Sequence, residues 1–270
     1  MNSTKGVGEI FRQCRAAQRA AFIPFLVAGY PDFDVSRKAV TAVAQSGADL
    51  VEIGIPYSDP LADGPTITRA SQRALEYGMT FDRALELAEA CAQRTPDVGF
   101  VGFSYYNPLL QRGLERTARD CAAAGLCGIV VPDLPLAEAQ VLRDAFTARG
   151  LAVIFLIAPT TPPQRAAEIA AQSSGFVYVV SRMGITGAQE GVAENLTDRL
   201  ALLRSLTDKP LAVGFGIDSA RTARAVASNA DGVIVGSALI DRMEAATCGE
   251  EAVASVRTMC LEFAAACLRT

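Results

Sequence analysis

The sequence of 270 residues contains no histidine and very little lysine, with only Lys5, Lys38 and Lys209. Histidine is the commonest general base and the commonest metal ligand, so its absence excludes histidine-dependent triads and a histidine-ligated metal aldolase. Any acid–base chemistry must therefore fall to carboxylates, tyrosines or water.

Long apolar runs and strong basic charge are also missing. No run approaches the roughly 20 apolar residues of a membrane span, and the amino-terminal stretch MNSTKGVGEIFRQC lacks the apolar core of a signal peptide. The net charge is −4 and the basic residues are scattered, which gives no footprint for nucleic acid. These absences predict a cytoplasmic protein that binds neither membranes nor nucleic acid.

The seven cysteines are odd in number and widely spaced, and no C-x-x-C pair occurs. This pattern favours reduced thiols in the core or on helix faces over disulfides or zinc ligands. We therefore expect structural roles for all of them.

Eight short apolar runs recur at fairly even spacing. They span residues 21–29, 49–56, 98–104, 126–132, 151–159, 175–181, 210–216 and 231–237. Near-continuous apolar runs are typical of parallel strands that are covered on both faces. Segments of helical composition lie between them, and several end in the glycine that commonly follows a helix, namely Gly47, Gly125, Gly150 and Gly175.

Eight strands that alternate with helices predict an α/β fold, a (β/α)8 TIM barrel in which residues 1–270 form a single domain. An amphipathic segment before the first strand and a helix over about 250–268 would add an extra N-terminal helix and a long C-terminal helix. A doubly wound open sheet is the alternative, although no G-x-G-x-x-G motif follows the first strand. None of the three lysines falls at a predicted carboxyl end of a strand, so a Schiff-base aldolase is not expected.

Glu52 lies inside the second apolar run, in the stretch VEIGIPYSDPLADGP of residues 51–65. Side chains alternate along a strand, so Glu52 and Gly54 share one face, and this face lines the barrel interior if the apolar residues beside them pack on the helices. Burial would raise the pKa of Glu52 and give an acid that can donate and retake a proton near neutral pH. The structural alternative is a buried ion pair.

Two more carboxylates, Asp59 and Asp63, follow in a turn-rich loop over the end of this strand. Active sites of such barrels lie at the carboxyl ends of the strands and in the loops after them. Asp63 is therefore a candidate catalytic group, and an Asx turn that caps the loop is the alternative.

The motif GFGIDS follows the seventh predicted strand, and GSALI follows the eighth. Loops at these two places bind phosphate in many barrels through backbone N–H groups and a helix N-terminus. Gly214, Gly216 and Gly236 would let the backbone approach an anion, and Ser237 could donate a hydroxyl bond. Plain tight turns are the alternative.

The segment SRMGITG of residues 181–187 has the composition of a mobile lid, although a surface loop explains it as well. Four aromatic residues at or near strand ends could line a flat apolar pocket or pack in the core, namely Phe25, Tyr105, Tyr178 and Phe215. Taken together, these patterns favour an enzyme that acts on a phosphorylated, partly aromatic small molecule through carboxylate acid–base chemistry.

The stretch VEIGIPYSDPLADGP resembles the signature of the tryptophan synthase alpha chain family. Further segments resemble that family in the family's order, namely FIPFLVAGYPD, SYYNPLLQRG, VPDLP, IAPTTPPQR, GFVYVVSRMGITGA, VGFGI and VGSALI. The resemblance covers essentially the whole chain. It implies a (β/α)8 barrel and a lyase of tryptophan biosynthesis, which cleaves indole-3-glycerol phosphate to indole and glyceraldehyde 3-phosphate in a retro-aldol reaction.

The resemblance also implies roles for residues. Glu52 matches the catalytic glutamate that transfers a proton at indole C3 and at the glycerol hydroxyl, and Asp63 matches the catalytic aspartate that binds the indole N–H. Thr186 and Gly187 match a lid in which Thr186 orients Asp63. The phosphate site would comprise Gly187, Gly216, Gly236 and Ser237, and the indole pocket with its surroundings Phe25, Tyr105, Tyr178 and Phe215.

No cofactor and no metal are implied, because the indole ring itself serves as the electron sink. The family's usual partner is a pyridoxal-phosphate β chain in an α2β2 heterotetramer, and Asp59 and the loop around Pro135 match the places of that contact. Two alternatives stay open, a free-standing indole-3-glycerol phosphate lyase and a weakly active allosteric subunit of a β chain.

Overall fold

The computed structural model describes residues 5–181, 190–214 and 216–268. The strands in this part of the chain are β1 Ala21–Val27, β2 Leu50–Gly54, β3 Gly99–Phe103, β4 Leu126–Val130, β5 Ala152–Ile154, β6 Leu156–Ile157, β7 Val177–Val180, β8 Leu211–Gly214 and β9 Gly232–Val235. The helices are α1 Val7–Ala16, α2 Phe33–Ala44, α3 Pro65–Glu76, α4 Phe81–Arg94, α5 Tyr106–Arg112, α6 Leu114–Ala123, the 3-10 turn η1 Leu136–Glu138, α7 Gln140–Thr147, α8 Pro163–Gln172, α9 Glu190–Leu206, α10 Ala220–Ala227, α11 Ser237–Glu244 and α12 Gly249–Ala266.

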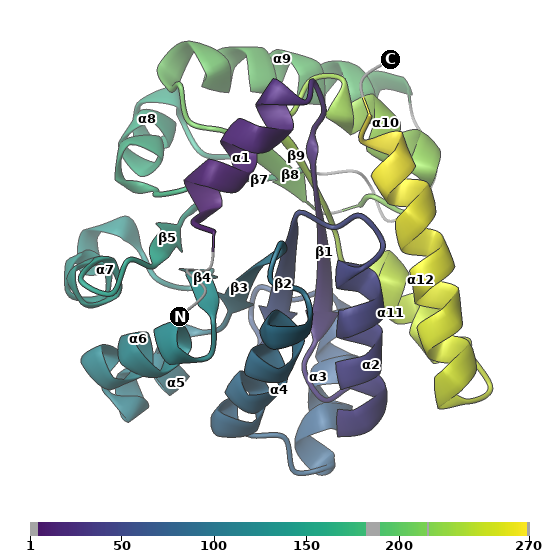
Figure 1. The fold of residues 1–270 in the computed structure, drawn as a ribbon. Coiled ribbons are helices and arrows are strands. Elements are labelled where there is room, and N and C mark those ends of the chain that lie inside the picture. Colours follow the sequence, from purple (N-terminus) through teal and green to yellow (C-terminus); the bar gives the residue numbers. More distant parts are fainter. Residues whose placement is uncertain (1–4, 182–189, 215, 269–270) are drawn as a thin grey trace.

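The strands form one parallel sheet in the order β5-β4-β3-β2-β1-β9-β8-β7-β6. Its two edge strands, β5 and β6, follow each other in the chain on either side of Phe155, so the sheet curls into a nearly closed barrel. The predicted (β/α)8 fold is confirmed, and helices surround the barrel in Figure 1.

One predicted strand, residues 151–159, is divided in two. β5 pairs with β4 and β6 pairs with β7. At this seam the amide of Val153 donates to the hydroxyl of Ser174 at 2.7 Å, and the amide of Phe155 donates to the hydroxyl of Ser173 at 3.1 Å. Two serine hydroxyls thus accept hydrogen bonds from backbone amides that would pair with a neighbouring strand in an unbroken sheet.

Helix α1 packs against the amino-terminal end of the barrel. Gly99, at the start of β3, leaves room for it, because a Cβ there would lie 2.5 Å from Cδ1 of Ile10. Likewise a Cβ on Gly175 would lie 2.6 Å from Cγ1 of Val7. Figure 1 shows α1 across the end at which β1 begins. Because α1 covers this end, the opposite end of the barrel, where the strands terminate, is the one available for an active site.

All four glycines have positive φ, with 90°, 81°, 74° and 84° at Gly47, Gly125, Gly150 and Gly175. The predicted helix ends are confirmed near the first three, whereas α8 ends earlier than predicted, at Gln172, and Ser173 is already extended. The predicted long C-terminal helix is α12, which lies along α2 and α11 (Figure 1). Three helices were not predicted, α3, α5 and α11. They are short or bury few apolar side chains: α3 buries only Ala70, Ser71 and Ala74, and α5 buries only Leu109.

The buried apolar residues of the described chain form one continuous cluster that spans the barrel interior and the layer between strands and helices. Within the described ranges, no helix combines the length and the apolar character that crossing a membrane requires.

Candidate active site

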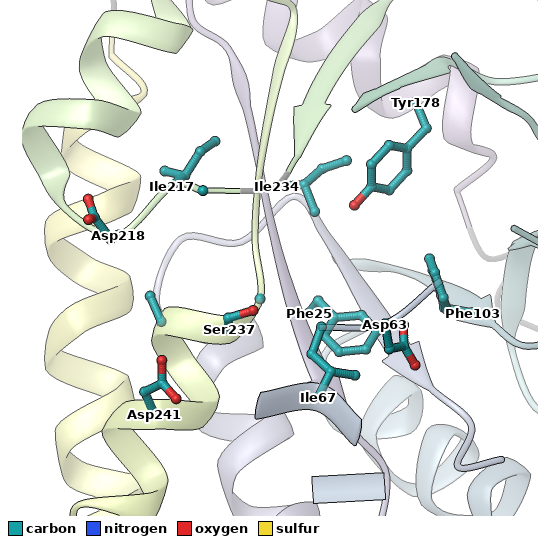
Figure 2. Close-up of a pocket in the computed structure, with 13 residues that line it drawn as sticks. Phe25, Asp63, Ile67, Phe103, Tyr178, Ile217, Asp218, Ile234, Ser237 and Asp241 are labelled. Atoms are coloured by element: carbon teal, nitrogen blue, oxygen red, sulfur yellow. The ribbon is translucent and has the colours of Figure 1, made fainter. Parts of the chain in front are cut away.

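A cavity opens at the carboxyl ends of the strands. Its walls come from β1, β3, β7 and β9, from the loop after β8, and from α3 and α11. The lining residues are Phe25, Asp63, Ile67, Phe103, Tyr178, Gly216, Ile217, Asp218, Ile234, Gly236, Ser237, Ala238 and Asp241. In Figure 2, Asp63 lies beside Phe25 at one end, and Ser237 and Asp241 lie toward the other. The cavity therefore has an aromatic end and a polar end.

Glu52 is buried beneath the aromatic end, with 1% of its surface exposed. It is paired in register with Phe25 of β1, and a Cβ on Gly54 would lie 2.5 Å from Cζ of Phe25. Glu52 and Gly54 share a face of β2, so Glu52 points into the barrel as predicted. Among the described residues it does not line the cavity directly but lies behind its wall.

The carboxyl group of Glu52 is shielded from solvent and has no partner in the part of the chain that the structure describes. Neither oxygen has a hydrogen-bond partner among the described residues, so the alternative of a buried ion pair is not found there. Burial raises the pKa of Glu52 from 4.5 to about 8, because a carboxylate without water or a partner is disfavoured. At neutral pH the group is largely a carboxylic acid.

Asp63 is half-buried in the loop between β2 and α3, directly before Gly64, the N-cap of α3. Burial raises the pKa of Asp63 to about 6, and a hydrogen bond from the Tyr105 hydroxyl lowers it in part. The same hydroxyl accepts the backbone amide of Ala62 at 3.1 Å. The described contacts of this carboxyl are thus to a tyrosine at the end of β3, and no Asx turn is seen within them.

Aromatic rings form the wall between the two carboxyl groups. Phe25 and Phe103 meet edge to face, with centroids 5.5 Å apart and planes at 80°. Tyr178 is buried, and a Cβ on Gly214 would lie 2.5 Å from its hydroxyl oxygen. Burial raises the pKa of Tyr178, and the charges of Glu52 and Asp63 raise it further. The Tyr178 hydroxyl therefore lies within electrostatic reach of both carboxyl groups.

The polar end is built on the start of α11. Gly236 is its N-cap, and no side-chain cap is found among the described residues. The amide of Leu239 donates to the carbonyl of Gly236 at 2.9 Å, which leaves the amides of Ser237 and Ala238, two cavity-lining residues, without an acceptor in the described chain. Gly216 lines the same end with a φ of 75°. Gly214 does not belong to this group: it makes room for the hydroxyl of Tyr178 rather than for an anion.

Six of the predicted site residues line this one cavity, namely Phe25, Asp63, Tyr178, Gly216, Gly236 and Ser237. Glu52 and Tyr105 lie directly behind its wall. Thr186, Gly187 and Phe215 lie outside the described residues.

Several lining residues were not predicted. Phe103 pairs in register with Gly54 at the end of β3, and this alignment of strand ends would have identified it. Ile67 and Asp241 come from α3 and α11, which were not predicted as helices, and Asp218 follows Gly216 in the loop after β8.

Known proteins resemble the chain over almost its full length. The family model of the tryptophan synthase alpha chain matches residues 11–267. The tryptophan synthase alpha chain of Chloroflexus aurantiacus is 51% identical over 239 residues, which cover 88% of this chain and 90% of that protein. That of Picosynechococcus sp. is 44% identical over 256 residues, which cover 94% and 96%.

Solved structures agree with these relatives. A structure of tryptophan synthase from M. tuberculosis, an open form with BRD0059 bound, superposes with a TM-score of 0.88 at 38% identity, covering 97% of this chain and 98% of that one. Tryptophan synthase subunit alpha from Legionella pneumophila str. Paris superposes with a TM-score of 0.89 at 30% identity, covering 96% and 97%. On sequence and on fold alike, the chain belongs to the tryptophan synthase alpha chain family.

Proposed function

We propose that this chain is the α subunit of a tryptophan synthase, and that Glu52 and Asp63 carry its cleavage of indole-3-glycerol phosphate to indole and glyceraldehyde 3-phosphate. The observation that carries the assignment is the pair of carboxyl groups with separated pKa values, about 6 for Asp63, which lines the aromatic end of the cavity, and about 8 for Glu52, which lies behind the wall of that end. Near pH 7 such a pair holds one acid and one carboxylate, which is how enzymes divide acid and base roles.

In the first step, the protonated Glu52 donates its proton to C3 of the indole ring. The ring then carries a positive charge that is shared with its N–H, and the carboxylate of Asp63 accepts a hydrogen bond from that N–H. Burial strengthens this interaction, because the medium around the pair is poorly polarisable.

In the second step, the ionised Glu52 takes the proton of the glycerol hydroxyl next to the ring. The oxygen's electrons form the aldehyde carbonyl, the carbon–carbon bond to C3 breaks, and its electron pair returns to the ring and neutralises it. Indole and glyceraldehyde 3-phosphate leave, and Glu52 is again protonated. Each positioned group of this kind supplies roughly 10²–10⁴ in rate.

The two ends of the cavity divide the substrate between them. The ring would lie against Phe25, Phe103 and Tyr178, where apolar and edge-to-face contacts favour a flat aromatic molecule. The phosphate would lie at the start of α11, near Gly236 and Ser237, where the amides of Ser237 and Ala238 and the helix N-terminus favour an anion. We propose that Thr186, Gly187 and Phe215 complete these two ends.

We also propose a β chain as partner, in an α2β2 assembly. Leu61 is 91% exposed, and Asp59 beside it and Pro135 are exposed as well, so these loops offer an apolar contact with a polar rim. Tyr57, in the same loop as Leu61, packs against Tyr105 with ring centroids 5.3 Å apart and planes tilted by 31°. A partner that moves this loop would therefore reach Asp63 through Tyr105.

We further propose a cytoplasmic location and a single domain over residues 1–270. All seven cysteines are free, and six of them are buried, which suits a reducing compartment. The one continuous apolar cluster supports a single folding unit.

Indole release from indole-3-glycerol phosphate, measured with the purified chain alone and with an added tryptophan synthase β chain, tests the proposal. Strong activation by the β chain is the expected result. Fast release by the chain alone, unchanged by the β chain, would favour a free-standing lyase. Negligible release alone that becomes substantial only with the β chain would favour an allosteric subunit, and the absence of turnover in both mixtures would refute the enzymatic function.

A further inference from the structure

Two side-chain contacts join α3 to α11 along one side of the cavity. The hydroxyl of Thr66 donates to Oδ1 of Asp241 at 2.9 Å. One turn further along both helices, the guanidinium of Arg69 donates to Oε2 of Glu244 at 3.0 Å. The partners in each contact are 175 positions apart in the sequence, so these contacts tie together distant parts of the chain.

The first contact joins the starts of the two helices that bear the two ends of the site. Thr66 lies in the first turn of α3, three residues after Asp63. Asp241 lies one turn after Ser237 on α11, and it lines the cavity itself. Only Gly64 and Pro65 separate Asp63 from Thr66, and a single helical turn separates Ser237 from Asp241. The bond therefore links α11 to the loop that presents Asp63.

Few other polar contacts fix the start of α3. Its fully buried side chains, Ala70, Ser71 and Ala74, are small and begin at the middle of the helix, and in the first turn Ile67 is partly buried against the core. The hydroxyl of Thr68 bonds only within the helix, to the carbonyl of Gly64 at 3.1 Å. Arg69 and Glu244 are 56% and 46% exposed, so solvent screens their pairing. The Thr66–Asp241 bond is also exposed to solvent, but it acts on the first turn itself, and this position suits it to tie the start of α3 to α11.

We propose that Thr66 and Asp241 are positioning residues that couple the polar end of the site to the aromatic end. An anion on the amides of α11 stabilises one position of that helix, and the Thr66–Asp241 bond carries this position to α3 and so to Asp63. Occupancy of the phosphate end then favours the placement of Asp63 that binds an indole N–H. This inference rests on the proposed function, because it assigns phosphate and ring to the two ends.

Calorimetric titration of the full chain with indole, without and with saturating inorganic phosphate, measures the coupling. We expect phosphate to tighten indole binding by about 5-fold or more, within the usual range for coupled sites. In Thr66→Val this factor falls to within twofold of unity, while the Kd for phosphate alone changes less than twofold. Thr66→Ser restores the hydroxyl and the coupling.

Thr68→Val is the matched control, because it removes a hydroxyl from the same helix without touching α11. It is expected to keep the wild-type coupling. On the other helix, Asp241→Ala abolishes the coupling and Asp241→Asn, which keeps an acceptor, retains it. Circular dichroism establishes whether each variant is folded. If Thr66→Val or Asp241→Ala fails to fold, the remaining variants, including Thr66→Ser and Asp241→Asn, still decide the test.

The inference would be overturned if phosphate tightened indole binding in Thr66→Val as much as in the wild type. It would also be overturned if Thr68→Val lost as much of this coupling as Thr66→Val. Absence of coupling in a wild-type chain that cleaves indole-3-glycerol phosphate would also overturn it and leave the proposed function intact. A wild-type chain that fails to cleave, with or without a β chain, would instead refute the proposed function, and the binding experiment would still decide whether the two ends are coupled.

Discussion

The hydroxyl of Tyr105 fixes the carboxyl group of Asp63 in place. It is hydrogen-bonded to Asp63 and also accepts the amide of the preceding residue, Ala62, at 3.1 Å. Tyr105 is 2% exposed and stands at the N-cap of α5, directly after β3, so it cannot move far. The tyrosine therefore anchors the loop that carries Asp63.

Tyr105→Phe should slow the reaction and change its pH dependence. The hydroxyl lowers the pKa of Asp63, so its loss raises that pKa above about 6 and leaves a larger fraction of Asp63 neutral at a given pH. We expect a 5- to 50-fold loss of kcat/KM near pH 6, on the order of one lost bond to a charged group, and a smaller loss near pH 8. Steady-state kinetics across this range measure both effects.

Tyr57→Phe is the control for this change. Its hydroxyl accepts from the side-chain amide of Asn107 at 3.4 Å, and the ring packs against Tyr105 without a described bond to Asp63. Tyr57→Phe should leave unchanged the pH below which kcat/KM falls. An equal shift in both variants would mean that the packing of the two rings, not the hydroxyl, sets the behaviour of Asp63.

The wild-type profile of kcat/KM against pH should be bell-shaped. Catalysis needs Glu52 protonated and Asp63 ionised, so the rate falls above about pH 8, where Glu52 loses its proton, and below about pH 6, where Asp63 gains one. The two limbs report apparent pKa values of the pair. The substrate phosphate also titrates near pH 6, so the shift in Tyr105→Phe assigns the acid limb. A rate that keeps rising to pH 9.5 would rule out an acid role for Glu52.

Glu52 should also make the free energy of unfolding depend on pH. Its pKa is about 8 when folded against an ordinary 4.5, so the folded state holds the proton more tightly. Its contribution to stability is greatest below about pH 4.5 and is lost as the pH rises toward and through 8, at up to roughly 1.4 kcal/mol per pH unit. Between pH 6 and 8, urea denaturation of the ligand-free wild type should show a fall of about 2–3 kcal/mol.

Glu52→Gln should abolish most of this slope and be the more stable protein at pH 8, because an amide costs less to bury than a carboxylate. Glu86→Gln on the exposed face of α4 is the matched control and should keep the wild-type slope. Parallel stability curves for the wild type and Glu52→Gln would contradict the raised pKa of Glu52.

Gly54→Ala should weaken the binding of the aromatic ring. A Cβ at this position would lie 2.5 Å from Cζ of Phe25, so the phenyl ring must turn toward the cavity. We expect about a 10-fold rise in the Kd of indole, little change in that of inorganic phosphate, and a loss of about 1–3 kcal/mol in stability. Gly64→Ala, where no atom lies within 4 Å of the new Cβ, should leave indole binding unchanged. Equal effects of the two substitutions would refute the role assigned to Gly54.

The sequence could predict the barrel because its strands are nearly continuous apolar runs separated by helical segments. The inward face of Glu52 followed from alternation alone, and its raised pKa followed from burial. The break at Phe155 could not be predicted, since it depends on the hydroxyls of Ser173 and Ser174, which lie 18 or more positions away along the chain.

The parts of the site that the sequence did not predict depend on short helices and on contacts over long distances. α3 buries three small side chains, and α11 has only eight residues, so its apolar stripe of Leu239, Ile240 and Met243 spans too short a stretch of sequence to indicate a helix. Asp241 enters the cavity only because α11 lies beside α3, and its bond to Thr66 spans 175 positions. The space that Gly54 and Gly214 leave for Phe25 and Tyr178 likewise requires the packed barrel.

The rate at which Glu52→Gln releases indole from indole-3-glycerol phosphate tests the proton-transfer role of Glu52 most directly. Glutamine fills the same space but cannot donate and retake a proton, so we predict a loss of about 10²–10⁴ in kcat, with a folded protein and Kd values for indole and inorganic phosphate within about threefold of the wild type. A folded Glu52→Gln chain that cleaves the substrate at a rate near that of the wild type would contradict the account.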